Sequence, residues 1–135
     1  MLNIQSIDHV GIRVSDKQRS ISFYADLGYE VLSDSGFDQG HPVIMRHPSG
    51  LILNLLGPAT DKAGENVLMD EPEKFPGYTH VALRITSAAD TEALMESLGV
   101  AITGRHTFKG MTSLFIRDPD RNVIELVERT GTDAE

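Results

Sequence analysis

Apolar and polar residues alternate in several short stretches of this chain, and the same order of stretches occurs twice. Within residues 7–14, Val10, Ile12 and Val14 alternate with polar or small residues, a pattern typical of a strand with one buried face. Apolar residues at helical spacing follow and end at Gly28, a residue type that commonly terminates helices. Further alternating stretches predict strands at about 29–35, 41–47 and 51–56.

The second half of the chain repeats this pattern at a constant offset. His80 aligns with His9, so the offset is 80 − 9 = 71 residues. Three blocks align at this offset without a gap: 7–16 with 78–87, 20–31 with 91–102, and 43–56 with 114–127. The pattern therefore indicates duplication of one β-α-β-β-β unit. The second copy has its predicted strands at 78–85, 100–107, 112–117 and 122–128, and its predicted helix after Ser87 or Asp90 and before Gly99.

We predict an α+β fold in a single domain spanning residues 1–135. It consists of paired βαβββ modules at about 4–56 and 78–128, which together form a curved mixed sheet around a cavity. The stretch 57–77 is rich in Pro, Gly and acidic residues and is predicted to be a linker. A unit this short cannot bury its sheet alone, so two units must pair, either within one chain or between chains.

Polar side chains stand at equivalent places in the two copies. Residues two apart share a strand face, so His9 and Arg13 point away from the apolar face of their strand, and His80 does the same in the second copy. The closing strands carry Asn54 and Glu125 at matching separations, 54 − 9 = 45 and 125 − 80 = 45. Two imidazoles and a carboxylate that converge on an enclosed face indicate a divalent metal site. The alternative is that each histidine only forms a hydrogen bond with its neighbouring Asn or Glu.

Composition narrows the possible partners. The net charge of −8 and the pI near 5.0 argue against a nucleic-acid partner, since no basic run offsets the acidic balance. Without cysteine, a metal can be held only by His, carboxylate or carbonyl groups. We expect no signal peptide and no membrane-spanning segment, and therefore a cytoplasmic protein that acts on a small molecule.

On these motifs the chain resembles the vicinal oxygen chelate superfamily, also called the glyoxalase/bleomycin-resistance/dioxygenase group, over residues 7–127. The resemblance implies paired βαβββ modules with a divalent metal held by the first and last strands of each. It places His9, His80 and Glu125 at three of the four metal positions of the family. The fourth position usually carries Glu or Gln. Here it is Asn54, which is shorter by a methylene and would either fall short of the ion or hold it through a water molecule.

Within the superfamily the chain looks most similar to the lactoylglutathione lyases. FYADLGYE and DPDRNVIELVE resemble the helix and final-strand motifs of that family, although Arg121 stands where Gly is usual. The resemblance implies isomerisation of a glutathione hemithioacetal through a metal-stabilised enediolate, with Glu125 as the proton shuttle. Arg13 matches the arginine that binds the glutathione carboxylate, and Lys109 lies in a segment similar to the one that closes over substrate. A homodimer is also implied. The resemblance implies one divalent metal ion but does not distinguish among Ni, Zn, Co, Mn and Fe.

Other chemistries of the superfamily remain open. His9, His80 and Glu125 also form a two-His-one-carboxylate set, as in non-haem Fe(II) ring-cleaving dioxygenases. Bleomycin-resistance-type members keep the fold, lack the metal and bind a ligand in the cavity. Thiol transferases resembling the fosfomycin-resistance proteins share the three-ligand pattern, but the C-terminal TGTDAE lacks the basic group that a phosphonate pocket would use.

Overall fold

A computed structural model describes residues 1–61 and 64–130 of the chain. Residues 62–63 of the predicted linker and residues 131–135 of the C-terminal stretch lie outside the described residues. The chain divides into two compact units, Met1–Asp61 and Lys62–Glu135. Each unit is described by itself below.

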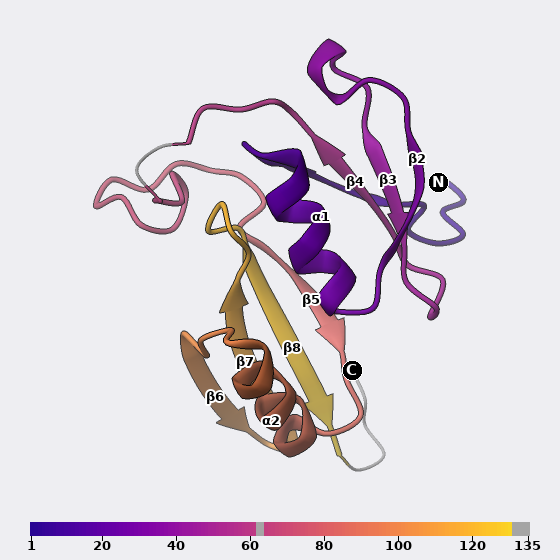
Figure 1. The fold of residues 1–135 in the computed structure, drawn as a ribbon. Coiled ribbons are helices and arrows are strands. Elements are labelled where there is room, and N and C mark those ends of the chain that lie inside the picture. The colour runs from indigo at the N-terminus through magenta and orange to yellow at the C-terminus, as the bar shows by residue number, and fades with distance from the viewer. Residues whose placement is uncertain (62–63, 131–135) are drawn as a thin grey trace. The chain divides into compact units, whose positions relative to one another are not determined.

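Each unit has the predicted order β-α-β-β-β (Figure 1), which confirms an α+β fold built from two modules. The first unit contains β1 (Val10–Arg13), α1 (Lys17–Asp26), β2 (Glu30–Asp34), the 3-10 helix η1 (Phe37–Gln39), β3 (Val43–Arg46) and β4 (Ile52–Leu56). The second contains β5 (His80–Arg84), α2 (Ala88–Leu98), β6 (Gly104–Phe108), β7 (Met111–Arg117) and β8 (Val123–Arg129). The short helix η1 was not predicted. Neither α-helix of the described part has the length and apolar character needed to cross a bilayer.

The two sheets have the same topology. Their strand orders are β1-β4-β3-β2 and β5-β8-β7-β6, with the first and last strands of each unit parallel and the other pairs antiparallel. Val10 pairs with Leu53, and Val81 pairs with Ile124, so the same register occurs in both units at the offset of 71. The backbone therefore repeats the duplication seen in the sequence, down to single residue pairs.

Both helices begin and end by the same physical devices. Asp16 caps α1 by accepting a hydrogen bond from the amide of Arg19, and Ser87 caps α2 in the same way at the equivalent position. Gly28 and Gly99 follow the helices with φ of 106° and 73°, conformations that favour glycine. Ser87, rather than Asp90, is thus the N-cap of the second helix.

The same sequence positions form the core of both units. In the first unit, Tyr24 of α1 is buried with alternate residues of β3 and β4; in the second, Met95 of α2 takes the place of Tyr24. The buried strand residues are Val43, Met45, Leu53 and Leu55 in the first unit and Leu114, Ile116, Ile124 and Leu126 in the second. α2 lies over β7 and β8 and covers one face of its sheet (Figure 1). Period-two alternation therefore placed one face of each closing strand in the core, as predicted.

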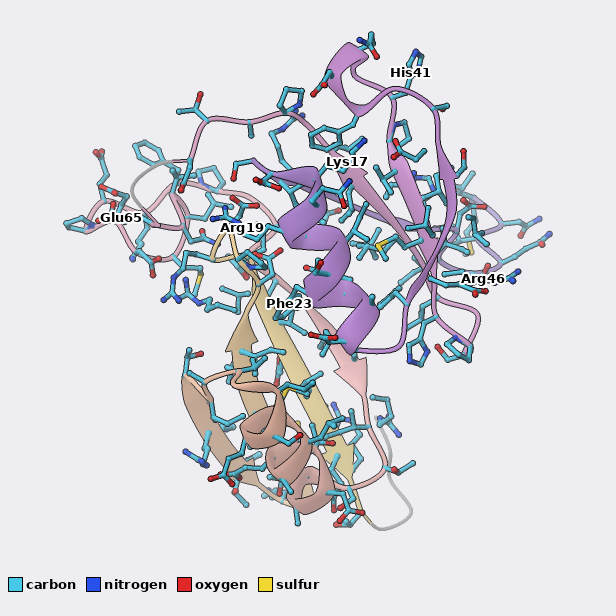
Figure 2. All side chains as sticks on the ribbon, in the orientation of Figure 1. Lys17, Arg19, Phe23, His41, Arg46 and Glu65 are labelled. Carbon is cyan, nitrogen blue, oxygen red and sulfur yellow. The ribbon has the colours of Figure 1, made fainter. Side chains whose placement is uncertain are left out.

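Two ion pairs join β2 to its neighbours in the first unit. Lys17, in the first turn of α1 (Figure 2), donates from Nζ to Asp34 Oδ2 at 3.0 Å. Arg46, at the end of β3, lies 3.5 Å from Glu30 Oε1. These side chains are partly exposed, so such contacts contribute less to stability than the core.

The turns before β4 and β8 also match each other. In both, the fourth residue donates its amide to the carbonyl of the first, Gly50 to His47 at 2.8 Å and Arg121 to Asp118 at 2.9 Å. The sequence favours Asn122 for a left-handed conformation at the second turn, because Asn tolerates it. This prediction is wrong: Arg121 is left-handed instead, with φ of 69°. Gly50 has φ of 97° at the equivalent position, which explains why Gly is the usual residue in this motif.

Some predicted strand ends differ from the structure. The first strand begins at Val10 and not at the predicted residue 7. In the register of β1 and β4, residues 7 and 8 would lie opposite Gly50 and Leu51, which precede β4. The strand predicted at 100–107 is Gly104–Phe108. The equivalent strand β2 has a register shift between Val31 and Ser33. Ser33 corresponds to Gly104 at the offset of 71, and β6 begins pairing at Gly104.

Residues after the first unit contact the β7–β8 turn within the second unit. Asp70 accepts two hydrogen bonds from the guanidinium of Arg117, at 3.0 and 3.1 Å. Asn66 donates from Nδ2 to the carbonyl of Arg121 at 3.1 Å. The hydrogen bond from Arg117 lowers the pKa of Asp70 to about 2. These contacts attach part of the predicted linker to the second sheet.

Exchanging the residue types at the equivalent turn positions is expected to shift stability in opposite directions. Arg121→Gly removes the backbone strain of a left-handed residue that carries a side chain, and it should stabilise the protein by about 1 kcal/mol. Gly50→Ala introduces that strain and should destabilise by about 1 kcal/mol, since nothing lies within 4 Å of an added Cβ to complicate the comparison. Urea unfolding of both variants measures the two shifts. Shifts of the same sign would contradict this account.

Asp70→Asn should destabilise the protein near pH 7 and have little effect in acid. The pKa of Asp70 is lowered from 3.8, so its ion pair stabilises the folded state fully above about pH 4, and this contribution is lost as the pH falls toward 2. Both side chains are partly exposed, so the expected loss is below about 1 kcal/mol. Unfolding midpoints between pH 7 and pH 3 test this, with the exposed Glu73→Gln as control. A difference that does not narrow in acid would contradict it.

Candidate functional site

His80 and Glu125 lie beside each other on one face of the second sheet. β5 and β8 pair in parallel with Ala82 opposite Glu125, so His80, two residues earlier, shares the face of the carboxylate. The Nε2 atom of His80 lies 3.1 Å from Oε1 of Glu125. The side chain of Glu125 is only 15% exposed and that of His80 is 35% exposed. The two atoms therefore converge on a partly exposed face of the sheet.

Two residues of β7 complete this face, and sequence reasoning did not single them out. Ser113 is fully buried, and its hydroxyl donates to Glu125 Oε2 at 2.6 Å. Phe115 pairs directly with Glu125 across the sheet, and its ring meets the imidazole of His80 edge-on, with 6.2 Å between centroids. The sequence contained a signal for the role of Ser113. Pairing the strands on either side of the turn DPDR as a hairpin places Ser113 on the same face as Glu125.

The residue before each histidine contacts its other ring nitrogen. Asp8 Oδ1 lies 2.7 Å from His9 Nδ1, and Thr79 Oγ1 lies 2.8 Å from His80 Nδ1. These two contacts are also related by the offset of 71, since 8 + 71 = 79. When Nε2 of a histidine binds a metal, its Nδ1–H can donate to such an oxygen. Without a metal, the hydrogen bond from His80 to Glu125 needs the proton on Nε2, and the hydroxyl of Thr79 then donates to Nδ1.

The corresponding face of the first unit is organised differently. Asn54 is paired with Gly11, so His9, two residues before Gly11, is predicted to share its face. Oδ1 of Asn54 is buried and has no hydrogen-bond partner within residues 1–61 and 64–130. Pro42 stands at the position equivalent to Ser113, since 42 + 71 = 113, and it has no hydroxyl to donate. The histidine–neighbour hydrogen bond considered from the sequence is therefore present for His80 and Glu125, while the oxygen of Asn54 has none.

The two predicted substrate-binding residues lie in different units. Arg13 is the exposed last residue of β1. By the alternation of side chains along a strand, it lies on the same face as His9 and Gly11. Lys109 occupies the two-residue turn between β6 and β7, with φ of 43°, followed by Gly110 with φ of 76°, as in a tight hairpin turn. The Nζ atom of Lys109 lies 5.5 Å from the ring centre of the exposed Phe108. Their roles in substrate binding stay predictions.

The side chains present fit a divalent metal ion in three respects. Their donors are imidazole nitrogen and carboxylate or amide oxygen, which suit borderline and hard cations. His80 Nε2 and Glu125 Oε1 lie 3.1 Å apart, close enough for one ion to bind both. The buried Oδ1 of Asn54 is an acceptor without a donor.

The four predicted ligands are divided equally between the units. His9 and Asn54 belong to the first unit, and His80 and Glu125 to the second. Among the described residues, no three His, Asp or Glu side chains are gathered into a cation-binding group. One unit by itself supplies two of the four donors, so the complete set stays a prediction that requires two units.

Comparison with known proteins agrees with the fold and with the sequence motifs. The family model of the Glyoxalase/Bleomycin resistance protein/Dioxygenase superfamily matches residues 6–126. A lactoylglutathione lyase of Escherichia coli O157:H7 is 32% identical over 128 residues, covering 89% of this chain and 90% of that protein.

Solved structures with this fold are more distant in sequence. A glyoxylase/bleomycin resistance protein/dioxygenase domain from Frankia sp. EAN1pec superposes with a TM-score of 0.73 at 21% identity, covering 95% of this chain and 100% of that one. The fosfomycin resistance protein FosX from Listeria monocytogenes gives 0.68 at 19% identity, covering 97% and 94%. At these identities the similarity concerns the fold alone.

Replacing Asn54 by Leu is expected to stabilise the metal-free protein. The change removes a buried oxygen that lacks a hydrogen bond, which should raise the free energy of unfolding by about 1 kcal/mol. Urea unfolding in a chelating buffer measures the shift. Asn66→Leu is the matched control and should destabilise, because the side chain of Asn66 accepts from the amide of Leu68 at 2.9 Å and donates to Arg121. A loss of stability in Asn54→Leu would mean that its oxygen is satisfied.

Proposed function

Because the chain belongs to the glyoxalase/bleomycin resistance protein/dioxygenase superfamily, we propose that it is a divalent-metal-dependent enzyme of the lactoylglutathione lyase type. The observation that carries the proposal is the approach of His80 Nε2 to Glu125 Oε1 on one partly open face. The 32% identity to a lactoylglutathione lyase over most of both chains supports the same choice of reaction.

The proposed metal ligands are His9, His80 and Glu125, with Asn54 at the fourth position either falling short of the ion or holding it through water. Each histidine offers Nε2, since its Nδ1 faces the side chain of the preceding residue. Each unit contributes one histidine and one oxygen donor, so the proposed site forms when two units pair, within one chain or across a homodimer.

Glu125 is the proposed proton carrier. A divalent ion in this site would polarise a substrate oxygen and so make the neighbouring C–H more acidic. The carboxylate of Glu125 takes the proton from one carbon at Oε1 and returns it to the adjacent carbon, so the reaction is an isomerisation with no net gain or loss of atoms. Oε2 accepts the hydroxyl of Ser113, so Oε1 is the proposed oxygen for this step, which requires that Oε1 is not bound to the ion while it carries the proton.

The proposed substrate is the hemithioacetal formed from glutathione and a 2-oxoaldehyde. A guanidinium can bind a carboxylate through two parallel hydrogen bonds, and Arg13 is the proposed partner of a glutathione carboxylate. Lys109, held at the tip of the β6–β7 hairpin, is the proposed second contact with the substrate. Glutathione is thus the expected cosubstrate.

A ring-cleaving dioxygenase is the second candidate, and Asn54 is the observation that favours it. A short neutral amide at the fourth position leaves His9, His80 and Glu125 as a two-His-one-carboxylate set, which suits Fe(II) and leaves positions for substrate and dioxygen. A metal-free ligand-binding protein of the bleomycin-resistance type is the account that remains if no metal binds.

Metal content tests the proposal directly. Protein purified without a His tag should contain one divalent ion per set of the four proposed ligands, measured by mass spectrometry. His80→Ala should lose this ion, whereas His106→Ala, an exposed histidine of the same unit, should retain it. Absence of metal from the wild type, together with no binding on titration, would overturn the enzyme proposals and favour a ligand-binding protein.

The identity of the ion and an activity assay separate the two enzymes. Nickel, zinc, cobalt or manganese should accompany conversion of methylglyoxal and glutathione to the thioester, and Glu125→Gln should reduce this rate by about 10²- to 10⁴-fold. The control His106→Ala should keep the rate. Iron together with oxygen consumption on a catechol, and no activity on the hemithioacetal, would favour the dioxygenase instead.

A further inference from the structure

Ser113 stands behind Glu125, on the side away from His80. Its Oγ donates to Glu125 Oε2 at 2.6 Å, while His80 Nε2 lies 3.1 Å from Oε1 of the same carboxylate. We propose that Ser113 is a positioning residue, which occupies Oε2 of Glu125 and thereby presents Oε1 together with the imidazole of His80 to the metal and the substrate. This inference rests on the proposed function.

The backbone holds Ser113 firmly in this place. Ser113 pairs with Val127 in the β7–β8 ladder, so it is the diagonal neighbour of Glu125 on the same face. It is fully buried in the middle of a seven-residue strand. A serine side chain has a single heavy-atom torsion, so little conformational freedom is lost when its hydroxyl is directed at the carboxylate. The donor is therefore in position before any ligand arrives.

The chemistry of the contact gives the two carboxylate oxygens different roles. A hydroxyl that donates to an ionised oxygen at this distance forms a strong, charge-assisted hydrogen bond. Rotation of the carboxylate by half a turn would exchange its oxygens, but it would break and remake this bond, and rotation by a quarter turn would lose it. Ser113 thus favours an orientation in which one oxygen, Oε1, is available as a ligand or proton carrier.

The first unit provides a comparison within the same chain. Pro42 replaces Ser113 and Ile44 replaces Phe115 at the equivalent positions, and neither has a side-chain donor to offer Asn54. Correspondingly, Oδ1 of Asn54 has no hydrogen-bond partner among the described residues. The hydroxyl occurs in the unit whose ligand is a carboxylate, which is the group that must both bind a cation and carry a proton.

Cobalt titration tests the proposal. The probe is Co²⁺ alone, followed by its visible absorption, with metal-free wild type, Ser113→Ala, Ser113→Thr and Thr112→Ala. Ser113→Ala should bind Co²⁺ at least about tenfold more weakly and with an altered spectrum, because an outer-shell hydrogen bond has been lost. Ser113→Thr keeps a hydroxyl and should restore binding to within about threefold of wild type. Thr112→Ala removes a hydroxyl from the adjacent position of β7, on the opposite face, and should bind like wild type.

A double-mutant cycle shows whether Ser113 acts through Glu125. In a Glu125→Ala background, which has no acceptor for the hydroxyl, the further change Ser113→Ala should have little effect on cobalt affinity. In urea unfolding without metal, the two changes should be coupled by about tenfold in the unfolding equilibrium constant. Unchanged affinity in Ser113→Ala, or an equal effect with and without Glu125, would overturn the positioning role.

The two proposals fail in distinguishable ways. If wild-type protein binds no Co²⁺, the proposed metal enzyme fails, and with it the claim that Ser113 presents Oε1 to a metal. If wild type binds Co²⁺ but the unfolding cycle shows no coupling, the metal site stands and only the role of Ser113 is overturned. The unfolding curves also show directly whether each variant is folded.

Discussion

The parallel pairing between the first and last strands of each unit is the interaction on which the candidate site depends. It brings His80 and Glu125 into contact although 125 − 80 = 45 residues separate them, and it sets Asn54 opposite Gly11 in the first unit. In a strand, a slip of one residue turns every side chain to the other face. Such a slip would exchange Glu125 with the buried Ile124 or Leu126, so the hydrophobic core and the candidate site enforce the same register.

The turn that joins β7 to β8 also supports this register, because β7 is the other neighbour of β8 in the sheet. Asp118 is buried, and its carboxylate accepts from the amides of Asp120 and Asn122 and from the side chain of Asn122. His47 has a related role in the first unit, where Nδ1 accepts from the amide of Ser49 at 3.0 Å. These contacts determine where β8 begins relative to β7, and hence which residue of β7 lies behind Glu125.

The two units share a backbone but differ in the polarity of the face that carries the predicted ligands. In the second unit, Glu125 has the hydroxyl of Ser113 on one oxygen and His80 on the other. In the first, the smaller amide of Asn54 has an oxygen without a donor. Duplication therefore provides two equivalent frames, and substitution has made them chemically unequal. On our proposal this inequality assigns proton transfer to Glu125 alone.

The sequence by itself determined the two β-α-β-β-β units, the residues that form their cores and the glycines that end their helices, because these follow from local periodicity and from backbone preference. It also indicated which strand positions carry the candidate ligands, since period-two alternation is a local property. Only the tertiary structure decided that Ser113 donates to Glu125, that Arg121 rather than Asn122 is left-handed, and that the first strand begins at Val10. Each of these depends on a partner strand or turn distant along the chain, whose exact position arises when the core packs.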